Sequence, residues 1–232
     1  MTIAHRGTQE LDRLGEGLET YNPMLMLHGE EQVIFNKPFV VDKTYVCSEG
    51  VIDVKDKKKG CLCRTETSIV DKESGELYAT VRTGLFLRKL GGFGFKGKTK
   101  DKILKPPQRA PDFVGEEVTQ ANQAFVYRLN CDLNPLHVDP QMAALGGFEK
   151  PILHGLCTYA ISTRAVQKKY SPKDAQALEQ VNARFTSFVL PGETLLVEMW
   201  KEGNNVIFQT KTKERGVPAC QGFVTLKPQP KL

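Results

Sequence analysis

The sequence GLCTYAISTRAVQKK occupies positions 155–169 and decides the fold of this 232-residue chain. Its small or apolar residues lie on most sides of a helix: Leu156, Cys157, Tyr159, Ala160, Ile161, Ala165 and Val166. A helix that is apolar around most of its girth must be enclosed by other elements. We therefore expect a buried helix here, covered by the elements that follow it in the chain.

Four strand candidates follow this helix, at 181–190, 194–201, 205–213 and 219–226. Glycine-containing turns separate them, as expected for an antiparallel meander. A meander that curls around a buried helix is the hotdog arrangement, in the α+β class. The second half of the chain is therefore predicted to be a hotdog unit.

The first half ends in a similar meander, with strand-like runs at 32–35, 43–54, 61–70 and 77–88. The proline-rich segment 106–111 blocks both helix and central strand, so it is predicted to be an exposed linker. The predicted organisation is a double hotdog, with units at 1–105 and 112–232 and an antiparallel sheet curled around a central helix in each.

Two shorter helices are expected before the enclosed one. Thr119 is a plausible N-cap for a helix at 120–129, and Asp139-Pro140 starts another that Gly146-Gly147 ends. Between them the chain must break at 132–135. That break contains the most chemically suggestive residues of the sequence.

Asp132 and His137 stand on either side of an Asn134-Pro135 turn. An imidazole titrates near neutral pH, and a nearby carboxylate orients it or acts as a second proton-transfer group. A turn aspartate with a solvated histidine is the plain alternative. The proline-stiffened turn favours a functional pair. So does Gly155 at the start of the enclosed helix, where backbone N–H groups can hold a carbonyl oxygen that becomes negative.

Composition and charge narrow the function class. The net charge of +5, from 32 basic and 27 acidic residues, is too balanced to indicate nucleic-acid binding. No apolar run approaches the length of a membrane span, and the N-terminus has no secretory pattern, so an intracellular protein with reduced, buried cysteines is expected. The final Lys231-Leu232 resembles the peroxisomal address Ser-Lys-Leu, with Pro230 in place of serine. Peroxisomal location is predicted, with cytoplasmic location as the alternative.

Two other kinds of site are disfavoured. Residues 92–99, GFGFKGKT, match the phosphate-loop pattern GxxxxGK[ST], but the prolines at 106 and 107 stop any long helix after it. We expect a flexible glycine-lysine loop there, with contact to ligand phosphates as an intermediate possibility. The four histidines show no metal-ligand spacing and no cysteine pair complements them, so no metal site is predicted.

The segments YRLNCDLNPLHVDP and GFEKPILHGLCTYA resemble hydratase 2, the (R)-specific enoyl-CoA hydratase family of the MaoC-like group. The likeness is nearest to the hydratase domain of peroxisomal multifunctional enzymes of type 2. It extends to LHGEE at 27–31, GGFGFKG at 91–97, ARF at 183–185 and EMWKEGN at 198–204, and so spans most of the chain.

This resemblance implies a double hotdog whose second half is catalytic and whose first half shapes the acyl pocket. Asp132 and His137 would activate the water added across a trans-2-enoyl-CoA, giving a (3R)-3-hydroxyacyl-CoA in fatty-acid β-oxidation. The N–H of Gly155 would polarise the thioester carbonyl, and Asn134 would fix the site. Relatives contact the CoA ester at the positions of His28, Gly29, Lys57 and Phe185. No metal or redox cofactor is implied.

Three departures from the family pattern qualify the resemblance. Cys131 stands where relatives usually have glycine. The chain starts after a family segment that holds the first strand and a functional glutamate, so we expect an incomplete first unit. The dehydrogenase and sterol-carrier domains of the multifunctional enzyme are not in this sequence.

Two alternatives stay open from the sequence. One is another hotdog enzyme that acts on acyl thioesters, a thioesterase or a dehydratase. The other is a non-catalytic module for acyl-CoA binding or dimerisation. A homodimer fits either.

Overall fold

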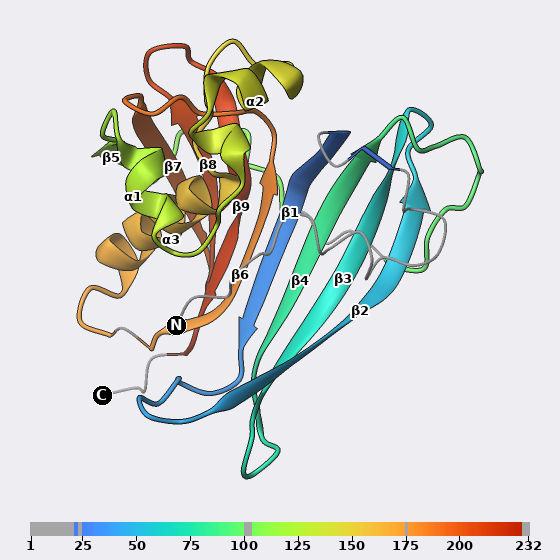
Figure 1. The fold of residues 1–232 in the computed structure, drawn as a ribbon. Helices are drawn as coiled ribbons and strands as arrows, with labels where there is room; N and C mark the ends of the chain where they lie inside the picture. The colour runs from blue at the N-terminus through green and yellow to red at the C-terminus, as the bar shows by residue number, and fades with distance from the viewer. Residues whose placement is uncertain (1–20, 23–24, 100–103, 175, 229–232) are drawn as a thin grey trace.

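The computed structural model describes residues 21–22, 25–99, 104–174 and 176–228. Within them, nine strands form one antiparallel sheet in the order β2-β3-β4-β1-β6-β9-β8-β7-β5 (Figure 1). The first-half strands are β1 Met26–Phe35, β2 Tyr45–Asp56, β3 Gly60–Asp71 and β4 Leu77–Arg88. The second-half strands are β5 Phe113–Val118, β6 Leu178–Phe185, β7 Thr194–Glu202, β8 Asn205–Thr212 and β9 Pro218–Leu226. The peroxisomal address predicted at the C-terminus lies outside the described residues.

The two halves of the chain meet through β1 and β6. These strands pair antiparallel, with Val33 opposite Val181. Instead of two separate sheets, the structure has one continuous sheet. The pairing of β1 with β6 satisfies the backbone N–H and C=O groups of two edge strands at once. The α+β hotdog class is confirmed. The helix expected in the first unit does not occur among the described residues of that half.

The second half holds the helices of the described structure. They are α1 Gln123–Arg128, a short 3-10 turn at Pro135–His137, α2 Pro140–Leu145 and α3 Gly155–Tyr170. The helix α3 lies against the curved face made by β5 to β9 (Figure 1). None of these helices is long and apolar enough to cross a membrane.

The enclosure of α3 is partial. One side packs into a core with Val166, Phe208 and Val224, all fully buried. The hydroxyl of Ser162, also buried, lies 2.6 Å from that of Thr210 in β8, so polar groups in this interface are paired. The opposite stripe, Ala160, Arg164 and Lys168, is exposed. The prediction of a helix enclosed on most sides was therefore wrong for one face, where the spacing of four keeps the three residues aligned.

The helix α1 is shorter than predicted and differently capped. Asn122 holds the N-cap position without a side-chain hydrogen bond. Thr119 instead donates its hydroxyl to the carbonyl of Glu193 at 2.7 Å and accepts from the N–H of Gly192 at 3.0 Å. The predicted cap was wrong because the β6–β7 connection competes for that hydroxyl. The apolar positions expected to define this helix are Ala121, Ala124, Phe125 and Leu129, and only Ala124 is buried.

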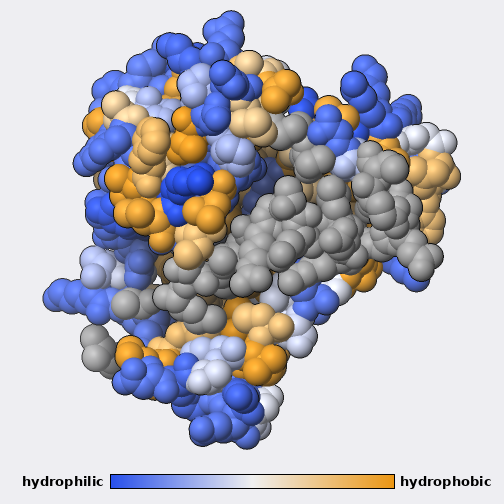
Figure 2. Space-filling view, viewed as in Figure 1, coloured by the Kyte–Doolittle hydropathy of each residue, from blue (hydrophilic) through white to orange (hydrophobic). Residues whose placement is uncertain are grey.

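Large apolar side chains of α1 and the turn after it are exposed, among them Phe125, Val126 and Leu129. Figure 2 shows apolar residues in orange among polar ones in blue on the side of the molecule that carries the helices.

Other differences concern single elements. Strand β5 at the edge beside β7 was not predicted. Strand β6 ends at Phe185 rather than at 190, because the chain from 186 to 189 leaves the sheet and lines a cavity. All six cysteines are free thiols, but Cys47 and Cys131 are exposed rather than buried.

Candidate active site

The turn that carries Asp132 is fixed by local hydrogen bonds. The N–H of Asn134 donates to the Asp132 carboxylate at 3.3 Å, and the Asn134 side-chain oxygen accepts from the N–H of Leu136 at 3.0 Å. Asn134 is thus the N-cap of the 3-10 turn that ends at His137. Cys131 has a φ of 69°, in the left-handed region that favours glycine. The Asn-Pro sequence therefore sets the positions of both predicted functional groups.

His137 offers a proton acceptor to the cavity. Its ring is buried, and Nδ1 lies 2.8 Å from the carbonyl oxygen of Ile152. Because a carbonyl oxygen can only accept, Nδ1 carries the proton and Nε2 of the neutral ring has a free lone pair. Burial lowers the pKa of His137, opposed by the Ile152 carbonyl and by Asp132. The neutral ring is therefore the form present at neutral pH.

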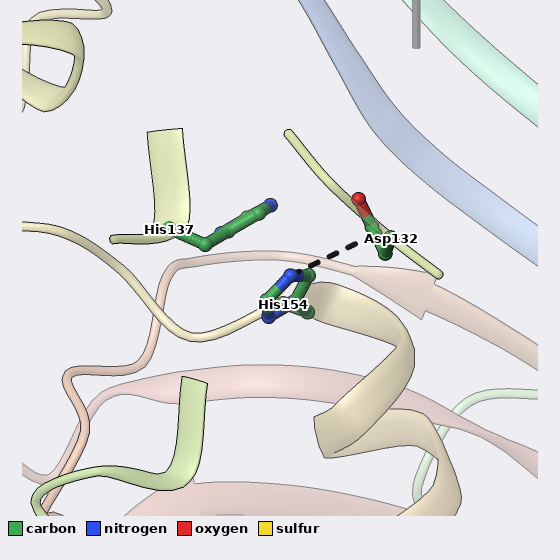
Figure 3. A group of neighbouring side chains, drawn as sticks. All are labelled: Asp132, His137 and His154. Carbon is green, nitrogen blue, oxygen red and sulfur yellow. Dashed lines mark ion pairs between the residues drawn. The ribbon is translucent and has the colours of Figure 1, made fainter. Parts of the chain in front are cut away.

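His154 lies beneath this pair. It is 1% exposed, and its ring stacks on His137 with centroids 3.7 Å apart. Its Nε2 is 3.9 Å from the Asp132 carboxylate, and neither ring nitrogen has a hydrogen-bond partner among the described residues (Figure 3). Burial, followed by the nearby His137, lowers the pKa of His154 to about 4. This ring is a neutral support for His137.

Gly155 supplies the first N–H group of α3. The amides at the start of a helix have no acceptor within it, and they carry a partial positive charge. A Cβ on Gly155 would lie 3.4 Å from ring atoms of Phe185, so glycine keeps this approach open. The helix start therefore presents donors to any carbonyl oxygen that lies beside Phe185.

A cavity of about 700 Å³ connects these groups. Every predicted site residue lines it: Asp132, His137, Asn134, Gly155, His28, Gly29, Lys57 and Phe185. Its apolar walls come from both halves, with Leu62, Leu85 and Phe86 from the first and Leu136, Phe148 and Ile152 from the second. A polar end that can move protons and an extended apolar wall suit a substrate with a reactive head and a hydrocarbon chain.

The first half contributes a second imidazole with a carboxylate. His28 Nε2 lies 3.0 Å from a carboxylate oxygen of the buried Glu31, and the Thr83 hydroxyl donates to the same oxygen at 2.9 Å. The ring of His28 meets Phe185 edge to face at 5.2 Å. His28 is thereby held against the residue that covers Gly155.

Glu30 links the two halves by ion pairs. Its carboxylate accepts from Arg64 of β3 at 3.1 and 2.8 Å and from Arg184 of β6. Gly84 lies between Glu30 and Arg64 in the register, and a Cβ there would be 2.9 Å from the Glu30 Cβ. Glycine in β4 therefore lets the side chain of Glu30 cross a strand to reach Arg64.

Asp132, His137 and His154 are also the set closest to a metal site among the described residues. Their donor atoms lie within 4.8 Å of one another. Two imidazoles and a carboxylate are also ligands that zinc accepts. The absence of a metal or redox cofactor therefore stays a prediction.

The loop that matches the phosphate-loop pattern has its amides engaged elsewhere. Asp56 accepts from the N–H groups of Gly92 and Gly94, at 3.1 and 2.5 Å. Asp53 accepts from the N–H groups of Lys98 and Thr99, at 2.8 and 3.1 Å. Carboxylates of the chain occupy the donors that would hold phosphates in a phosphate loop. The flexible loop expected from its glycines is instead pinned at four amides.

Sequence reasoning missed three contributors to this site. His154 was considered only among the four histidines without metal-ligand spacing, although its ring packs under His137. Glu30 and Arg184 also line the cavity. The register of β1 against β4 shifts between His28 and Glu30, and both residues line the cavity.

Comparisons with known proteins identify the family of the chain. The profile of the MaoC like domain matches residues 102–222, and that of the MFE-2 hydratase 2 N-terminal domain matches residues 2–89. The chain is 40% identical to "Enoyl-CoA hydratase 2, peroxisomal" of Arabidopsis thaliana over 94% of this chain and 74% of that protein. It is 38% identical to "Peroxisomal multifunctional enzyme type 2" of Mus musculus, over 90% of this chain and 29% of that protein.

A solved structure shares the fold closely. The MaoC-like dehydratase of Phytophthora capsici superposes with a TM-score of 0.85 at 38% identity. The match covers 90% of this chain and 74% of that one.

Proposed function

The chain belongs to the MaoC-like family and is a hydro-lyase similar to the enoyl-CoA hydratases 2; from this membership we propose that it adds water to trans-2-enoyl-CoA esters and forms (3R)-3-hydroxyacyl-CoA. The supporting observation is the convergence of Asp132, His137 and the start of α3 on one cavity with apolar walls. A carbonyl acceptor site and a proton-transfer pair are the two requirements of hydration beside a thioester.

The substrate carbonyl is oriented by the N–H of Gly155. As the water oxygen bonds to the β-carbon, electrons move toward the thioester oxygen, which becomes negative. Backbone donors at a helix start stabilise that charge without reorganising. One O–H bond of the water breaks and its proton passes to an enzyme base. A proton held by the pair Asp132 and His137 is then delivered to the α-carbon, which leaves the pair with the proton count it started with. The sum is one water added across the double bond.

His137 is proposed to receive the first proton. Its Nδ1 is committed to the Ile152 carbonyl, so Nε2 is the atom available to the water. Asp132 shares that water and balances the imidazolium that forms. Asn134 holds the turn in place through its cap on Leu136. His154 supports the ring from below and stays neutral.

The rest of the substrate is proposed to extend along the cavity. His28, Gly29, Lys57 and Phe185 line it and contact the CoA ester, and the apolar residues of both halves take the acyl chain. We place the reaction in fatty-acid β-oxidation in the peroxisome. Support comes from relatives whose names include the word peroxisomal. The homodimer stays a prediction.

The test is a steady-state assay with trans-2-decenoyl-CoA in which the product is resolved by chiral chromatography. We expect the R alcohol and no released CoA. An S product would contradict the proposed geometry even at high turnover. Release of free CoA would indicate a thioesterase, and binding without turnover would indicate the non-catalytic module.

A further inference from the structure

Two exposed phenylalanines lie on the loop that follows β4. The side chains of Phe93 and Phe95 are 51% and 48% exposed. Neither ring packs against another aromatic ring or a cation among the described residues. Single exposed apolar side chains are common on protein surfaces, but two aromatic rings two residues apart on one short loop offer flat apolar surface to a ligand or partner.

The loop presents these rings on a fixed backbone. The amides pinned to Asp56 belong to Gly92 and Gly94, on either side of Phe93. The N–H of Asp56 donates in turn to the carbonyl of Phe95 at 2.8 Å. Gly92, with a φ of 92°, adopts a backbone conformation that a larger residue would resist. The loop is ordered before any ligand arrives, which lowers the entropic cost of binding.

Lysines are frequent on this loop and on the hairpin tip hydrogen-bonded to it. Six are exposed and form no ion pair with a described residue: Lys57, Lys58, Lys59, Lys89, Lys96 and Lys98. The acidic residues between them, Asp53 and Asp56, are already bonded to backbone amides. Figure 1 places the hairpin between β2 and β3 and the C-terminal end of β4 at the same end of the sheet. At that end, Figure 2 shows polar residues in blue beside apolar ones. The region is therefore a cationic surface with two aromatic rings on it.

This surface is continuous with the active-site cavity. Lys57 belongs to the hairpin tip between β2 and β3 and also lines the cavity with Asp132 and His137. A substrate whose reacting end lies at Gly155 can therefore leave the cavity past Lys57. The loop that carries Phe93 and Phe95 is bonded to Asp56, the neighbour of Lys57 in the chain.

We propose that Phe93 and Phe95 form a stacking platform for the adenine of the CoA ester, with the surrounding lysines bound to its phosphates. The inference rests on the proposed function for the identity of the substrate. An aromatic ring binds a base by its π-face, and lysines are point charges suited to phosphate oxygens. The glycine loop thus binds a nucleotide through its side chains, while its amides donate hydrogen bonds to Asp53 and Asp56.

The test compares two thioesters, trans-2-decenoyl-CoA and trans-2-decenoyl-pantetheine, which lacks the nucleotide. In the double variant Phe93→Ala with Phe95→Ala, KM for the CoA ester is expected to rise about tenfold, the scale of losing one stacked base. The kcat should stay unchanged, as should KM for the pantetheine ester. Phe93→Trp should retain the low KM because it keeps a flat ring. Phe113→Ala, at an exposed phenylalanine on β5, is the matched control and should change neither KM.

An unchanged KM for the CoA ester in the double variant overturns the platform, as does an equal rise for both esters. Calorimetry with adenosine bisphosphate, the nucleotide piece alone, separates this inference from the proposed function. Wild-type turnover of both esters without nucleotide binding overturns the platform and leaves the hydratase standing. Nucleotide binding that the double variant loses, without turnover of either ester, supports the platform and overturns the hydratase.

Discussion

The two halves of the sheet differ in the size of the core that they carry. The second half holds α3 against the sheet, and twelve buried residues form one cluster there. In the first half the buried residues fall into clusters of four and three, and half of the residues of strand β2 are exposed. The cavity lies where these halves meet and is lined from both.

The difference separates two requirements of a catalyst. Proton-transfer groups must be held to within a fraction of an ångström, which needs a well-packed support. Groups that bind the substrate chain tolerate more adjustment. Asp132, His137 and Gly155 all belong to the half with the larger core, whereas Lys57 and the pinned glycine loop belong to the other. We therefore expect substitutions in the second half to affect kcat and those in the first to affect KM.

The largest expected effect is on chemistry. Asp132→Asn and His137→Gln should each lower kcat by about 10² to 10⁴, the contribution of a positioned acid or base. The fold should survive, because asparagine keeps the shape of Asp132 and the amide of a glutamine in place of His137 can still donate toward the Ile152 carbonyl. Steady-state kinetics with circular dichroism as a folding check provide the measurement. Near-normal rates in both variants would contradict the proposed mechanism.

The matched first-half variant is Lys57→Ala. It removes a cation from the cavity wall without touching the proton-transfer pair, so KM should rise while kcat stays within a few fold. A loss of kcat as large as that of His137→Gln would contradict the assignment of chemistry to the second half and substrate binding to the first.

The second prediction concerns packing. Leu195 in β7 and Leu87 in β4 are both buried, at 0% and 1% exposure. Leucine-to-alanine changes in cores cost about 2 to 5 kcal/mol, and the cost is higher where neighbours cannot collapse into the cavity. The loss of unfolding free energy should be near the upper end of this range for Leu195→Ala and near the lower end for Leu87→Ala. Urea unfolding of both variants gives the comparison, and equal losses would show that the halves are equally well packed.

The third prediction uses the buried imidazole of His154. Its pKa is about 4 in the folded chain and about 6.5 when unfolded. As pH falls below 6.5, the unfolded chain takes up the proton first, so stability is lost down to pH 4 and no further below it. The loss from this group is about 3 kcal/mol.

His154→Asn removes this titration. Between pH 6.5 and 4, the unfolding free energy of the variant should depend less steeply on pH than that of the wild type. The difference in slope corresponds to at most one bound proton. Above about pH 7 the two curves should run parallel, which serves as the internal control. Equal slopes in the acid range would show that His154 is charged or solvated in the folded protein.

Much of the second half could be predicted from its sequence. Periodic apolar residues identified α3, and β-branched runs with glycine turns identified the strands after it. Asp132 and His137 were identifiable because an Asn-Pro turn rigidly connects them. Each of these features depends on residues close together in the chain, where local geometry limits the outcomes.

Features set by distant contacts could not be predicted. Thr119 caps no helix because Gly192 and Glu193 use its hydroxyl, and nothing near Thr119 indicates that. The stacking of His154 on His137 depends on how the 3-10 turn meets the start of α3. Glu30 reaches Arg64 only because Gly84 lies between them in the sheet register. In each case the deciding partner is far away in sequence.

The smallest expected effect lies in the catalytic turn itself. Cys131 has a φ of 69°, and a left-handed conformation costs a non-glycine residue about 1 to 2 kcal/mol. Glycine removes that cost but loses about 0.5 to 1 kcal/mol more backbone entropy on folding. Cys131→Gly should therefore stabilise the protein by about 0.5 to 1 kcal/mol, with kcat unchanged because Asn134 and Pro135 still fix the turn.

Lys89→Gly is the matched variant in the first half, since Lys89 has a φ of 66° outside the catalytic turn. Similar gains in urea midpoint for both variants would show that the strain is a property of each backbone position alone. A fall in kcat confined to Cys131→Gly would show instead that the cysteine side chain restricts the turn. In that case the precision of the catalytic half would depend on its loop as well as on its larger core.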